Sequence, residues 1–330
     1  MKETILYIDA FNLFYRNYSS HPSTDENGEP NGGVIGFISQ LRNYIDKFSP
    51  QYTIIVFDGD NAGYRRRNIY ENYKGKKARK KRFSYLKFDE DFIEKVDNEE
   101  LQIKQIYEIL KYLPCIILQI SYYEADDIIS YLVNGNKKFN HIVVSTDQDY
   151  IQLVEENIYV YSPTKKILFD TETVSKYYNI HHKNFLYSRL ISGDVSDKIT
   201  GIDGVALKSL IKIFPELKDK PISNYEEFEN LIINKENFKK NKKIDNLKNN
   251  IEIIRRNYKL CQLEYDNISL SSKKEISQQL LKENEKTFSI IKTKIFFIKK
   301  YLNFHFKNFE IWIKPFTFIK NKITLENVES

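Results

Sequence analysis

The sequence has few of the residues on which several classes of protein depend. Its 330 residues include only two cysteines, one methionine, one tryptophan, 11 glycines and eight prolines. Two isolated cysteines cannot form the disulfide framework of a small secreted domain, and they lack the spacing of a zinc-binding pair. No apolar run is long enough to span a bilayer. These absences exclude disulfide-rich and membrane-spanning classes, and we expect a cytoplasmic protein without a membrane partner.

Charged and aromatic residues are plentiful by contrast. Hydrophobic residues make up 41% of the chain, charged residues 29% and aromatic residues 14%, which is a globular composition. The 51 lysines and arginines exceed the 45 acids by six. A net charge of +6 is compatible with a nucleic-acid partner but too small to establish one. The distribution of charge along the chain therefore matters more than its total.

Three short apolar runs predict buried strands, at residues 5–8, 53–57 and 141–146. Helical patterns alternate with them, at residues 34–48, 100–113 and 125–133. This alternation predicts an α/β fold with a mostly parallel sheet flanked by helices. Each run is followed by an acidic residue, in order Asp9, Asp58 and Asp147. Because the carboxyl ends of parallel strands share one edge, where ligands bind, we expect the three aspartates to lie together.

The strand signal is weaker in the second half of the chain. Two helical patterns at 184–193 and 205–214 are joined by a segment that contains glycines and aspartates. Residues 235–250 are polar and of low complexity, and residues 273–303 have a helical pattern. The aromatic segment 309–319 predicts one or two strands.

Further carboxylates accompany the three at the predicted strand ends. They are Glu124, Asp126 and Asp127 in EADD, Asp149 in STDQD, and Asp194 and Asp197 in SGDVSD. Like charges a few ångströms apart repel by roughly 4 kcal/mol per pair at an effective dielectric constant near 20, so cations must neutralise such a cluster. Oxygen ligands without histidine or cysteine select Mg²⁺ or Mn²⁺ over zinc.

A pair of such ions is the usual apparatus for hydrolysing a phosphodiester, so the acids predict a metal-dependent nuclease. The alternative is that each aspartate only caps a turn or a helix. Recurrence of the acids at every predicted strand end, and again in EADD and SGDVSD, argues against that alternative.

Five ordered motifs resemble those of the 5′-nuclease, or flap endonuclease (FEN), family, most closely its standalone phage and bacterial 5′-3′ exonucleases. They are YIDAFNLFYR, VFDGD, YEADDIISYLV, VVSTDQDYIQLV and SGDVSDKITGIDGVALKSL, within residues 3–215. The resemblance implies a PIN-like α/β nuclease domain with an inserted helical arch and a helix-three-turn-helix DNA-binding module. It divides the chain into a nuclease domain at 1–180 with a basic arch at about 64–105, a helix-three-turn-helix region at 181–260, and a mainly helical extension of unknown role at 261–330.

The resemblance also assigns the carboxylates to two metal ions, Mg²⁺ with Mn²⁺ as a substitute. The first group comprises Asp9, Asp58, Glu124, Asp126 and Asp127. The second group comprises Asp147, Asp149, Asp194 and Asp197.

A strongly basic segment runs from Tyr64 to Arg82, with ten lysines and arginines, one acid and interleaved tyrosines. Such a segment can neutralise phosphates while its rings stack on unpaired bases, although solvated charge runs are common. The resemblance places the arch here. It implies catalytic roles for Lys74 and Lys77, with Lys74 at the scissile phosphate, and nucleic-acid contacts for Tyr73 and Arg79 as well.

The segment GIDGVALKSL resembles the hairpin of the helix-three-turn-helix module. Its glycines would let backbone N–H groups approach duplex phosphates. The resemblance implies nucleic-acid contacts at Gly201, Gly204 and Lys208 and a K⁺ ion at the hairpin. Ala206 departs from the family pattern, which has glycine at that position.

The resemblance therefore implies a monomeric, two-metal, structure-specific 5′-nuclease of DNA replication or repair. Its substrates would be branched, flapped or nicked DNA and RNA–DNA hybrids, from which it would remove primers in an RNase H-like reaction. A single-stranded DNA-binding protein is an expected partner. Two alternatives are a PIN-type ribonuclease, which would lack the hairpin and the arch, and a catalytically silent DNA-junction binding protein, which would gain nothing from acids facing phosphate.

Overall fold

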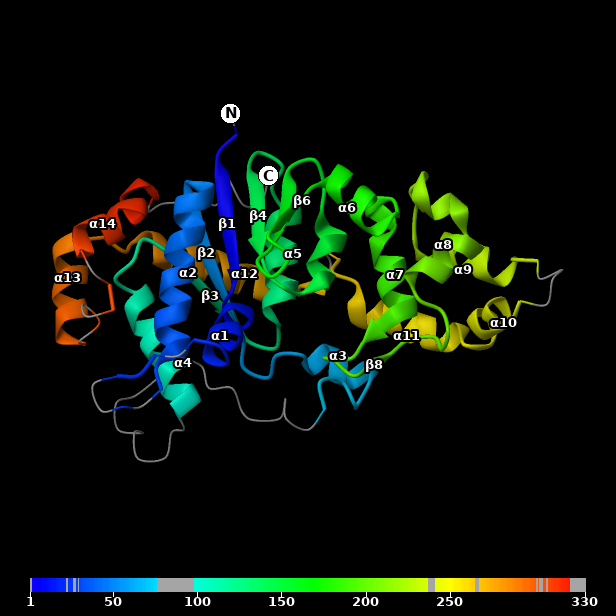
Figure 1. The fold of residues 1–330 in the computed structure, drawn as a ribbon, viewed down its shortest axis with the longest axis horizontal. Coiled ribbons are helices and arrows are strands. Elements are labelled where there is room, and N and C mark those ends of the chain that lie inside the picture. Colours follow the sequence, from blue (N-terminus) through cyan, green and yellow to red (C-terminus); the bar gives the residue numbers. More distant parts are fainter. Residues whose placement is uncertain are drawn as a thin grey trace.

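A six-stranded sheet forms the centre of the molecule in the computed structural model (Figure 1). The structure describes residues 2–21, 23–25, 28, 30–75, 98–236, 241–264, 267–300, 302, 305–306 and 308–320. The strands are β1 (Thr4–Asp9), β2 (Tyr52–Asp58), β3 (Ile116–Ile120), β4 (Asn140–Val144), β5 (Ile158–Ser162) and β6 (Ile167–Phe169). Their order is β3-β2-β1-β4-β5-β6, and only the β5–β6 pair is antiparallel among these strands.

The predicted α/β class with a mostly parallel sheet is confirmed. The three predicted runs became β1, β2 and β4, which lie side by side with β1 in the middle. Each is apolar and β-branched because parallel strands are covered on both faces. Alternate residues of β1 enter two different cores: Ile5 and Tyr7 face one, Leu6 and Ile8 the other.

Helices cover both faces of the sheet (Figure 1). The core that contains Leu6 and Ile8 is completed by α1 (Ala10–Tyr18), α2 (Gly32–Phe48) and α4 (Asn98–Leu110). The core that contains Ile5 and Tyr7 is completed by α5 (Ala125–Asn134) and by elements that follow β6. No helix within the described ranges is long and apolar enough to cross a membrane.

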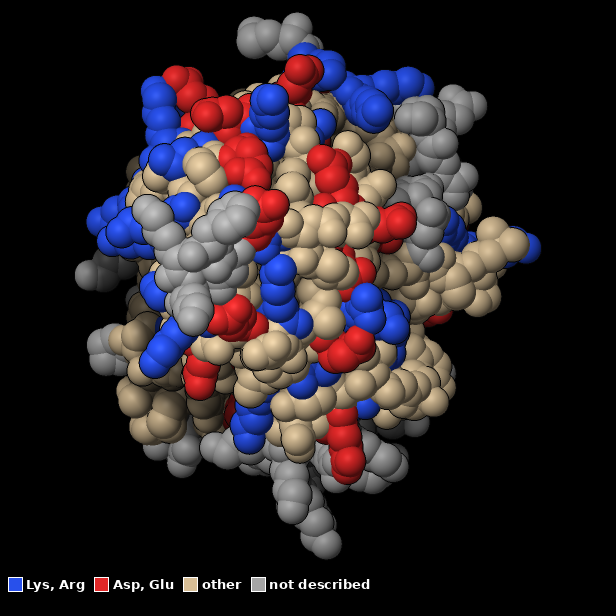
Figure 2. All heavy atoms as spheres, turned by 90° about the vertical axis from the view of Figure 1, so that its right-hand side faces the viewer, with Lys and Arg blue, Asp and Glu red and all other residues tan. Residues whose placement is uncertain are grey.

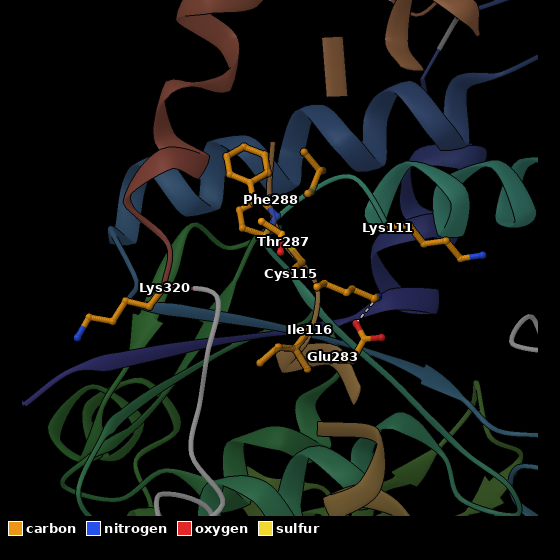
Figure 3. Close-up of a pocket in the computed structure, with 10 residues that line it drawn as sticks. Lys111, Cys115, Ile116, Glu283, Thr287, Phe288 and Lys320 are labelled. Atoms are coloured by element: carbon orange, nitrogen blue, oxygen red, sulfur yellow. Dashed lines mark hydrogen bonds and ion pairs between the residues drawn. The ribbon is translucent and has the colours of Figure 1, made fainter. Parts of the chain in front are cut away.

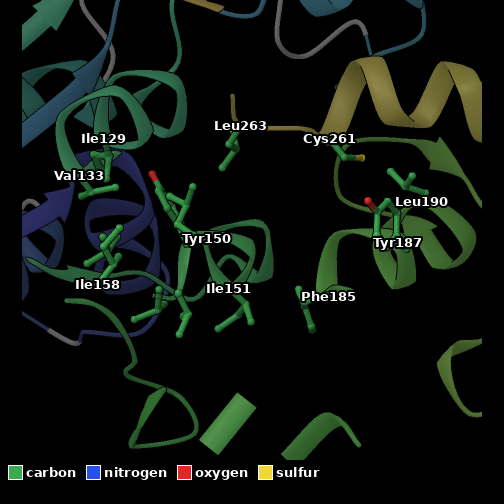
Figure 4. Close-up of a cluster of buried hydrophobic side chains, with 14 of the residues drawn as sticks. Ile129, Val133, Tyr150, Ile151, Ile158, Phe185, Tyr187, Leu190, Cys261 and Leu263 are labelled. Carbon is green, nitrogen blue, oxygen red and sulfur yellow. The ribbon is translucent and has the colours of Figure 1, made fainter. Parts of the chain in front are cut away.

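A helical region extends from one end of the sheet. It comprises α6 (Thr171–Tyr178), η5 (His182–Asn184), α7 (Phe185–Ser192), the short strands β7 (Gly193–Asp194) and β8 (Ile199–Thr200), α8 (Leu207–Ile213), η6 (Pro215–Lys218), α9 (Tyr225–Ile233), α10 (Lys242–Asn249) and α11 (Ile251–Cys261). The core continues into it without a break, since Tyr150 and Ile151 belong to the same cluster as Leu190 and Cys261 (Figure 4). The carboxylates of SGDVSD are thereby tied rigidly to the sheet.

The C-terminal extension is helical and covers an edge of the sheet. It contains α12 (Leu270–Asn284), α13 (Ile290–Lys299), α14 (Phe309–Ile313) and η9 (Lys314–Phe318). The predicted strands at 309–319 are wrong. The reason is side-chain spacing: Trp312 packs against Phe309 and Phe316, which lie one helical turn away on either side.

Side chains of helix α12 hydrogen-bond the backbone of β3 along the edge of the sheet. The Gln279 amide accepts from the Gln119 N–H at 3.1 Å and donates to the Gln119 carbonyl at 2.8 Å. Glu283 accepts from the Ile117 N–H at 3.0 Å and lies beside Cys115 and Ile116 (Figure 3). These contacts satisfy groups that would otherwise pair with another strand.

Candidate metal centre

An open pocket of about 430 Å³ lies at the carboxyl edge of the sheet. Parallel pairing of β1 with β2 and with β4 brings the ends of these strands together at that edge. Of the nine acids assigned from the sequence, six line the pocket: Asp9, Asp58, Glu124, Asp126, Asp147 and Asp197. The other three, Asp127, Asp149 and Asp194, form ion pairs with arginines beside it.

The first two strand-end aspartates are held by backbone N–H groups. Asp9 ends β1 and caps α1, because its carboxylate accepts from the Asn12 N–H at 3.0 Å. Its other oxygen accepts from the Tyr150 hydroxyl at 3.2 Å. Asp58 ends β2 and accepts from the Ala125 N–H at 2.9 Å. Each aspartate is thus fixed at a helix start while its side chain still faces the pocket.

The EADD segment begins α5. Glu124 is the N-cap residue and forms a capping box with Asp127: the Glu124 carboxylate accepts from the Asp127 N–H, and the Asp127 carboxylate accepts from the Glu124 N–H at 3.3 Å. The positive end of the helix dipole stabilises acids at this place. Ligand oxygens of Glu124, Asp126 and Asp127 lie within 4.8 Å of one another, close enough for one metal ion.

Arg66 lies beneath these three carboxylates and is almost completely buried. It belongs to α3 (Tyr64–Ile69), and its side chain is 2% exposed. Its guanidinium forms an ion pair with Glu124 and pairs at 3.0 Å with Asp126 and with Asp127. The basic segment that contains Arg66 predicts contacts with phosphate, and for Arg66 this prediction is wrong because its side chain neutralises the protein's own acids.

Lys74 and Tyr73 connect the first group of acids with Asp197. Lys74 forms an ion pair with Glu124 and lies 4.0 Å from Asp197, and its side chain is 32% exposed in the pocket. The Tyr73 hydroxyl lies 3.1 Å from Glu124 and 3.0 Å from Asp197. The Tyr73 ring is 2% exposed, so in this structure it is packed in the core instead of being presented to a base.

The second group is organised by Arg189 of α7. Asp147 caps η4 (Gln148–Leu153) and accepts from the Asp149 N–H at 2.8 Å. Arg189 pairs with Asp149 at 2.6 Å and also forms an ion pair with Asp194. Asp194 in turn accepts from the Asp197 N–H at 3.1 Å, which fixes the turn that carries Asp197 into the pocket.

The pKa values of the pocket acids indicate that nearby lysine and arginine side chains compensate only part of the negative charge. Burial and the neighbouring Asp149 raise the pKa of Asp147 to about 8. Burial also raises the pKa of Asp126, despite the nearby Arg66. Burial opposes ionisation of Glu124 too, but Lys74 and Arg66 hold its pKa well below the ordinary range. A further cation would allow Asp126 and Asp147 to ionise.

The two hairpin glycines lie between α7 and α8, and Lys208 lies in the first turn of α8. A Cβ atom on Gly201 would come within 2.4 Å of the Ser192 carbonyl, so glycine is required there by packing against α7. Gly204 has a φ of 71° and open space around it. Ala206 is the N-cap of α8, and Lys208 is exposed. On the face seen in Figure 2, positive and negative side chains are interspersed.

Two predicted site residues lie outside the described residues, and two residues that contact the acids were not predicted from the sequence. Lys77, Arg79 and most of the predicted arch fall in 76–97, outside the described residues. Arg189 and Tyr150 contact the acids but belong to no motif that predicts a site residue. Arg189 lies three residues before Ser192, the first residue of SGDVSD, inside a helical pattern where nothing distinguishes it from a surface arginine.

Known proteins similar to this chain include 5′-3′ exonucleases and a DNA polymerase. Residues 4–179 match the family described as the 5′-3′ exonuclease, N-terminal resolvase-like domain. A 5′-3′ exonuclease of Aquifex aeolicus is 32% identical over 241 residues, which cover 72% of this chain and 75% of the relative. DNA polymerase I of Caldicellulosiruptor bescii is 28% identical over 223 residues, which cover 64% of this chain but 24% of the polymerase.

A solved structure shares the fold. The bacteriophage T5 flap endonuclease, in a pseudo-enzyme-product complex with DNA and metal ions, superposes with a TM-score of 0.64 at 20% identity. The superposition covers 85% of this chain and 98% of the phage protein. At this identity the similarity establishes the architecture of the sheet and its flanking helices.

Proposed function

The chain belongs to the 5′-3′ exonuclease family of nucleases, and we propose that it hydrolyses phosphodiesters near 5′ ends and 5′ flaps with two divalent metal ions. The family membership predicted from the ordered motifs is confirmed. The observation that carries the proposal is the convergence of six carboxylates on one open pocket at the carboxyl edge of the sheet.

The residues present fit hard divalent cations. The pocket offers carboxylate oxygens from Asp9, Asp58, Glu124 and Asp126 on one side and from Asp147 and Asp197 on the other. Its described lining contains no histidine or cysteine. Carboxylate oxygens without nitrogen or sulfur ligands are the donor set that Mg²⁺ and Mn²⁺ prefer. Two aspartates with raised pKa values in the same pocket are the signature of a site short of positive charge.

Bound metal ions would lower the pKa of the attacking water and stabilise negative charge on the attacking and leaving oxygens. The protein's own residues would then bind and orient the substrate. The Lys74 ammonium faces the pocket and would contact the scissile phosphate. Arg66 and Arg189 hold the carboxylates in place and do not line the pocket.

The proposed substrates are branched, flapped or nicked DNA and RNA–DNA hybrids. The phage flap endonuclease binds DNA with the same fold, and the similar polymerase suggests a task in replication or repair. Gly201, Gly204 and Lys208 would hold the duplex. The domain boundaries, the roles of Lys77 and Arg79, a K⁺ ion at the hairpin, the monomeric state and a single-stranded DNA-binding protein as partner stay predictions from the resemblance.

Cleavage of a labelled 5′-flap duplex in Mg²⁺ tests the proposal. The intact protein should release the flap, Mn²⁺ should replace Mg²⁺, and chelation should abolish the reaction. Asp147→Asn combined with Asp149→Asn should remove cleavage, whereas Asp219→Asn, at an exposed site on η6's C-cap, should not. A protein that binds the flap in Mg²⁺ but never cuts it would be a junction-binding protein and would refute the nuclease proposal.

Lys74→Ala separates catalysis from binding. Because the ammonium faces the pocket, its loss should slow single-turnover cleavage far more than it weakens flap binding. Lys208→Ala, in the first turn of α8, should weaken binding with little effect on the single-turnover rate. An unchanged cleavage rate for Lys74→Ala would remove Lys74 from the reaction.

A further inference from the structure

Two exposed tyrosines lie together in the segments that follow the neighbouring strands β2 and β3. Tyr122 follows β3 and is 54% exposed, and Tyr64 begins α3 and is 53% exposed. Their rings are 5.9 Å apart with an interplanar angle of 70°. Large aromatic side chains usually bury most of their surface, so two adjacent exposed tyrosines indicate a role other than packing.

The backbone of Tyr122 is held in an unfavourable conformation. Its φ of 72° lies in the left-handed region, where a bulky residue is an outlier and glycine is favoured. Two hydrogen bonds between the loops fix it there: the Tyr122 N–H donates to the Asp60 carbonyl at 2.7 Å, and the Gly59 N–H donates to the Tyr123 carbonyl at 3.0 Å. Strain of this kind is typical of functional sites.

The tyrosine pair lies near the pocket residue Glu124 through its neighbours in the chain. Tyr122 precedes the pocket residue Glu124 by two positions. Gly63, which precedes Tyr64, packs so closely on Glu124 that a Cβ atom there would lie 3.4 Å from the carboxyl carbon. A group stacked on the tyrosines would therefore lie next to a phosphate bound in the pocket.

A cationic side chain accompanies the rings. The Arg67 guanidinium lies against Gly63, where an added Cβ atom would be 2.9 Å from Nη1. It donates to the Asn61 carbonyl at 3.2 Å and forms no ion pair with the residues that the structure describes. Its neighbours Arg65 and Arg66, in contrast, both pair with Asp127. The Arg67 guanidinium can therefore pair with an anionic ligand.

We infer that Tyr64 and Tyr122 form a stacking platform for one unpaired nucleobase of the substrate, with Arg67 at the adjoining phosphate. Exposed rings next to a cation are how proteins bind single-stranded nucleic acid without reading its sequence. This inference rests on the proposed nuclease function and adds a subsite to it. The platform would keep a base out of the duplex stack close to the carboxylates.

Flap binding measured by fluorescence anisotropy in chelator tests the platform without cleavage. Tyr122→Gly removes the ring and suits the left-handed backbone, so this variant should unfold at the same temperature as the wild type or higher. It should bind the flap about tenfold more weakly, as expected for loss of one stacked base. Tyr177→Ala, at a tyrosine of matched 51% exposure on α6, should bind normally.

An abasic scan identifies the base. Replacing the unpaired nucleotides one at a time with abasic sites should weaken wild-type binding about tenfold at one position. Tyr122→Gly should be insensitive to that replacement, which is the coupling expected of two groups in contact. Normal flap binding by Tyr122→Gly, or an equal loss with intact and abasic flaps, would overturn the platform and leave the nuclease proposal standing. Failure of the wild type to bind any flap would overturn both.

Discussion

The sheet buries polar groups in two different ways at its two ends. At the carboxyl edge, Arg66 is buried as a charged group among the three carboxylates of EADD. Towards the amino-terminal end of β4, His141 is completely buried and bonds the Tyr7 hydroxyl at 3.1 Å and the Asn136 carbonyl at 2.6 Å. Burial lowers the pKa of His141 to about 4, so that residue is neutral.

The difference separates polar groups that serve a ligand from those that serve the fold. Buried ion pairs often contribute little net stability, because desolvation offsets the attraction between the charges. A neutral hydrogen-bonded pair fills a core at lower cost. Around Arg66 the protein buries charge at the edge where the proposed substrate would bind, whereas around His141 it buries a neutral hydrogen-bonded pair within the packed core.

Arg66→Met should have the largest effect and tests the charged end. Removing the guanidinium leaves three carboxylates without their buried counter-charge, and the free energy of unfolding should fall by about 3–5 kcal/mol. Urea denaturation measures this loss, and Mg²⁺ should recover part of it by supplying positive charge. Arg67→Met, a neighbour without an ion pair among the described residues, should change stability by less than about 0.5 kcal/mol. If Arg66→Met left the free energy of unfolding unchanged, the contrast between the charged and the neutral end would be wrong.

The pH dependence of unfolding tests the neutral end. The pKa of His141 is about 4 in the folded protein against 6.5 ordinarily, so the unfolded chain takes up the proton first as the pH falls. The contribution of His141 to stability is complete above pH 6.5 and should decline by about 3 kcal/mol between pH 6.5 and 4.

The matched variant is His141→Gln, whose amide can still donate to the Asn136 carbonyl. Its free energy of unfolding should fall less steeply over the same pH range than that of the wild type. Identical slopes for the two proteins would mean that His141 does not titrate below its ordinary range.

Arg189→Met should show that the second group of acids is less dependent on its arginine. The Arg189 side chain is 12% exposed, and its partners Asp149 and Asp194 are 10% and 16% exposed, so water can solvate the acids that it leaves. We expect a loss of about 1.5–3 kcal/mol, below that of Arg66→Met. Urea titrations of the two variants compare their losses of stability. A larger loss for Arg189→Met than for Arg66→Met would contradict the idea that the more deeply buried arginine contributes more.

Gln279→Leu should have the smallest effect, because it breaks neutral hydrogen bonds at the β3 edge. Loss of both bonds to Gln119 should cost about 1–2 kcal/mol. Gln278→Leu, one residue earlier and exposed, is the matched control and should leave stability nearly unchanged. A larger tendency of Gln279→Leu to aggregate, measured by light scattering, would follow from the uncovered strand.

Sequence reasoning found the acids but not the groups that hold them. Asp9, Asp58 and Asp147 could be placed together because apolar runs identify parallel strands and their ends share an edge. Arg66 could not be separated from Arg65 and Arg67, since three consecutive arginines look alike until the helix orients one of them inward. The aromatic content of 309–319 predicts strands, but Phe309, Trp312 and Phe316 have the spacing of a helix, and packing among them favours the helices that form.

The junction of the first strand with the last helices offers a place to hold the molecule for single-molecule work. Glu3, next to the start of β1, forms an ion pair with Lys320, and the Lys320 N–H donates to the Gln51 carbonyl. Asp9 lies at the other end of the same strand, roughly 20 Å away. A surface anchor or dye attached at this corner would leave the pocket facing the solution, so that one tethered protein could be watched as it meets successive DNA ends.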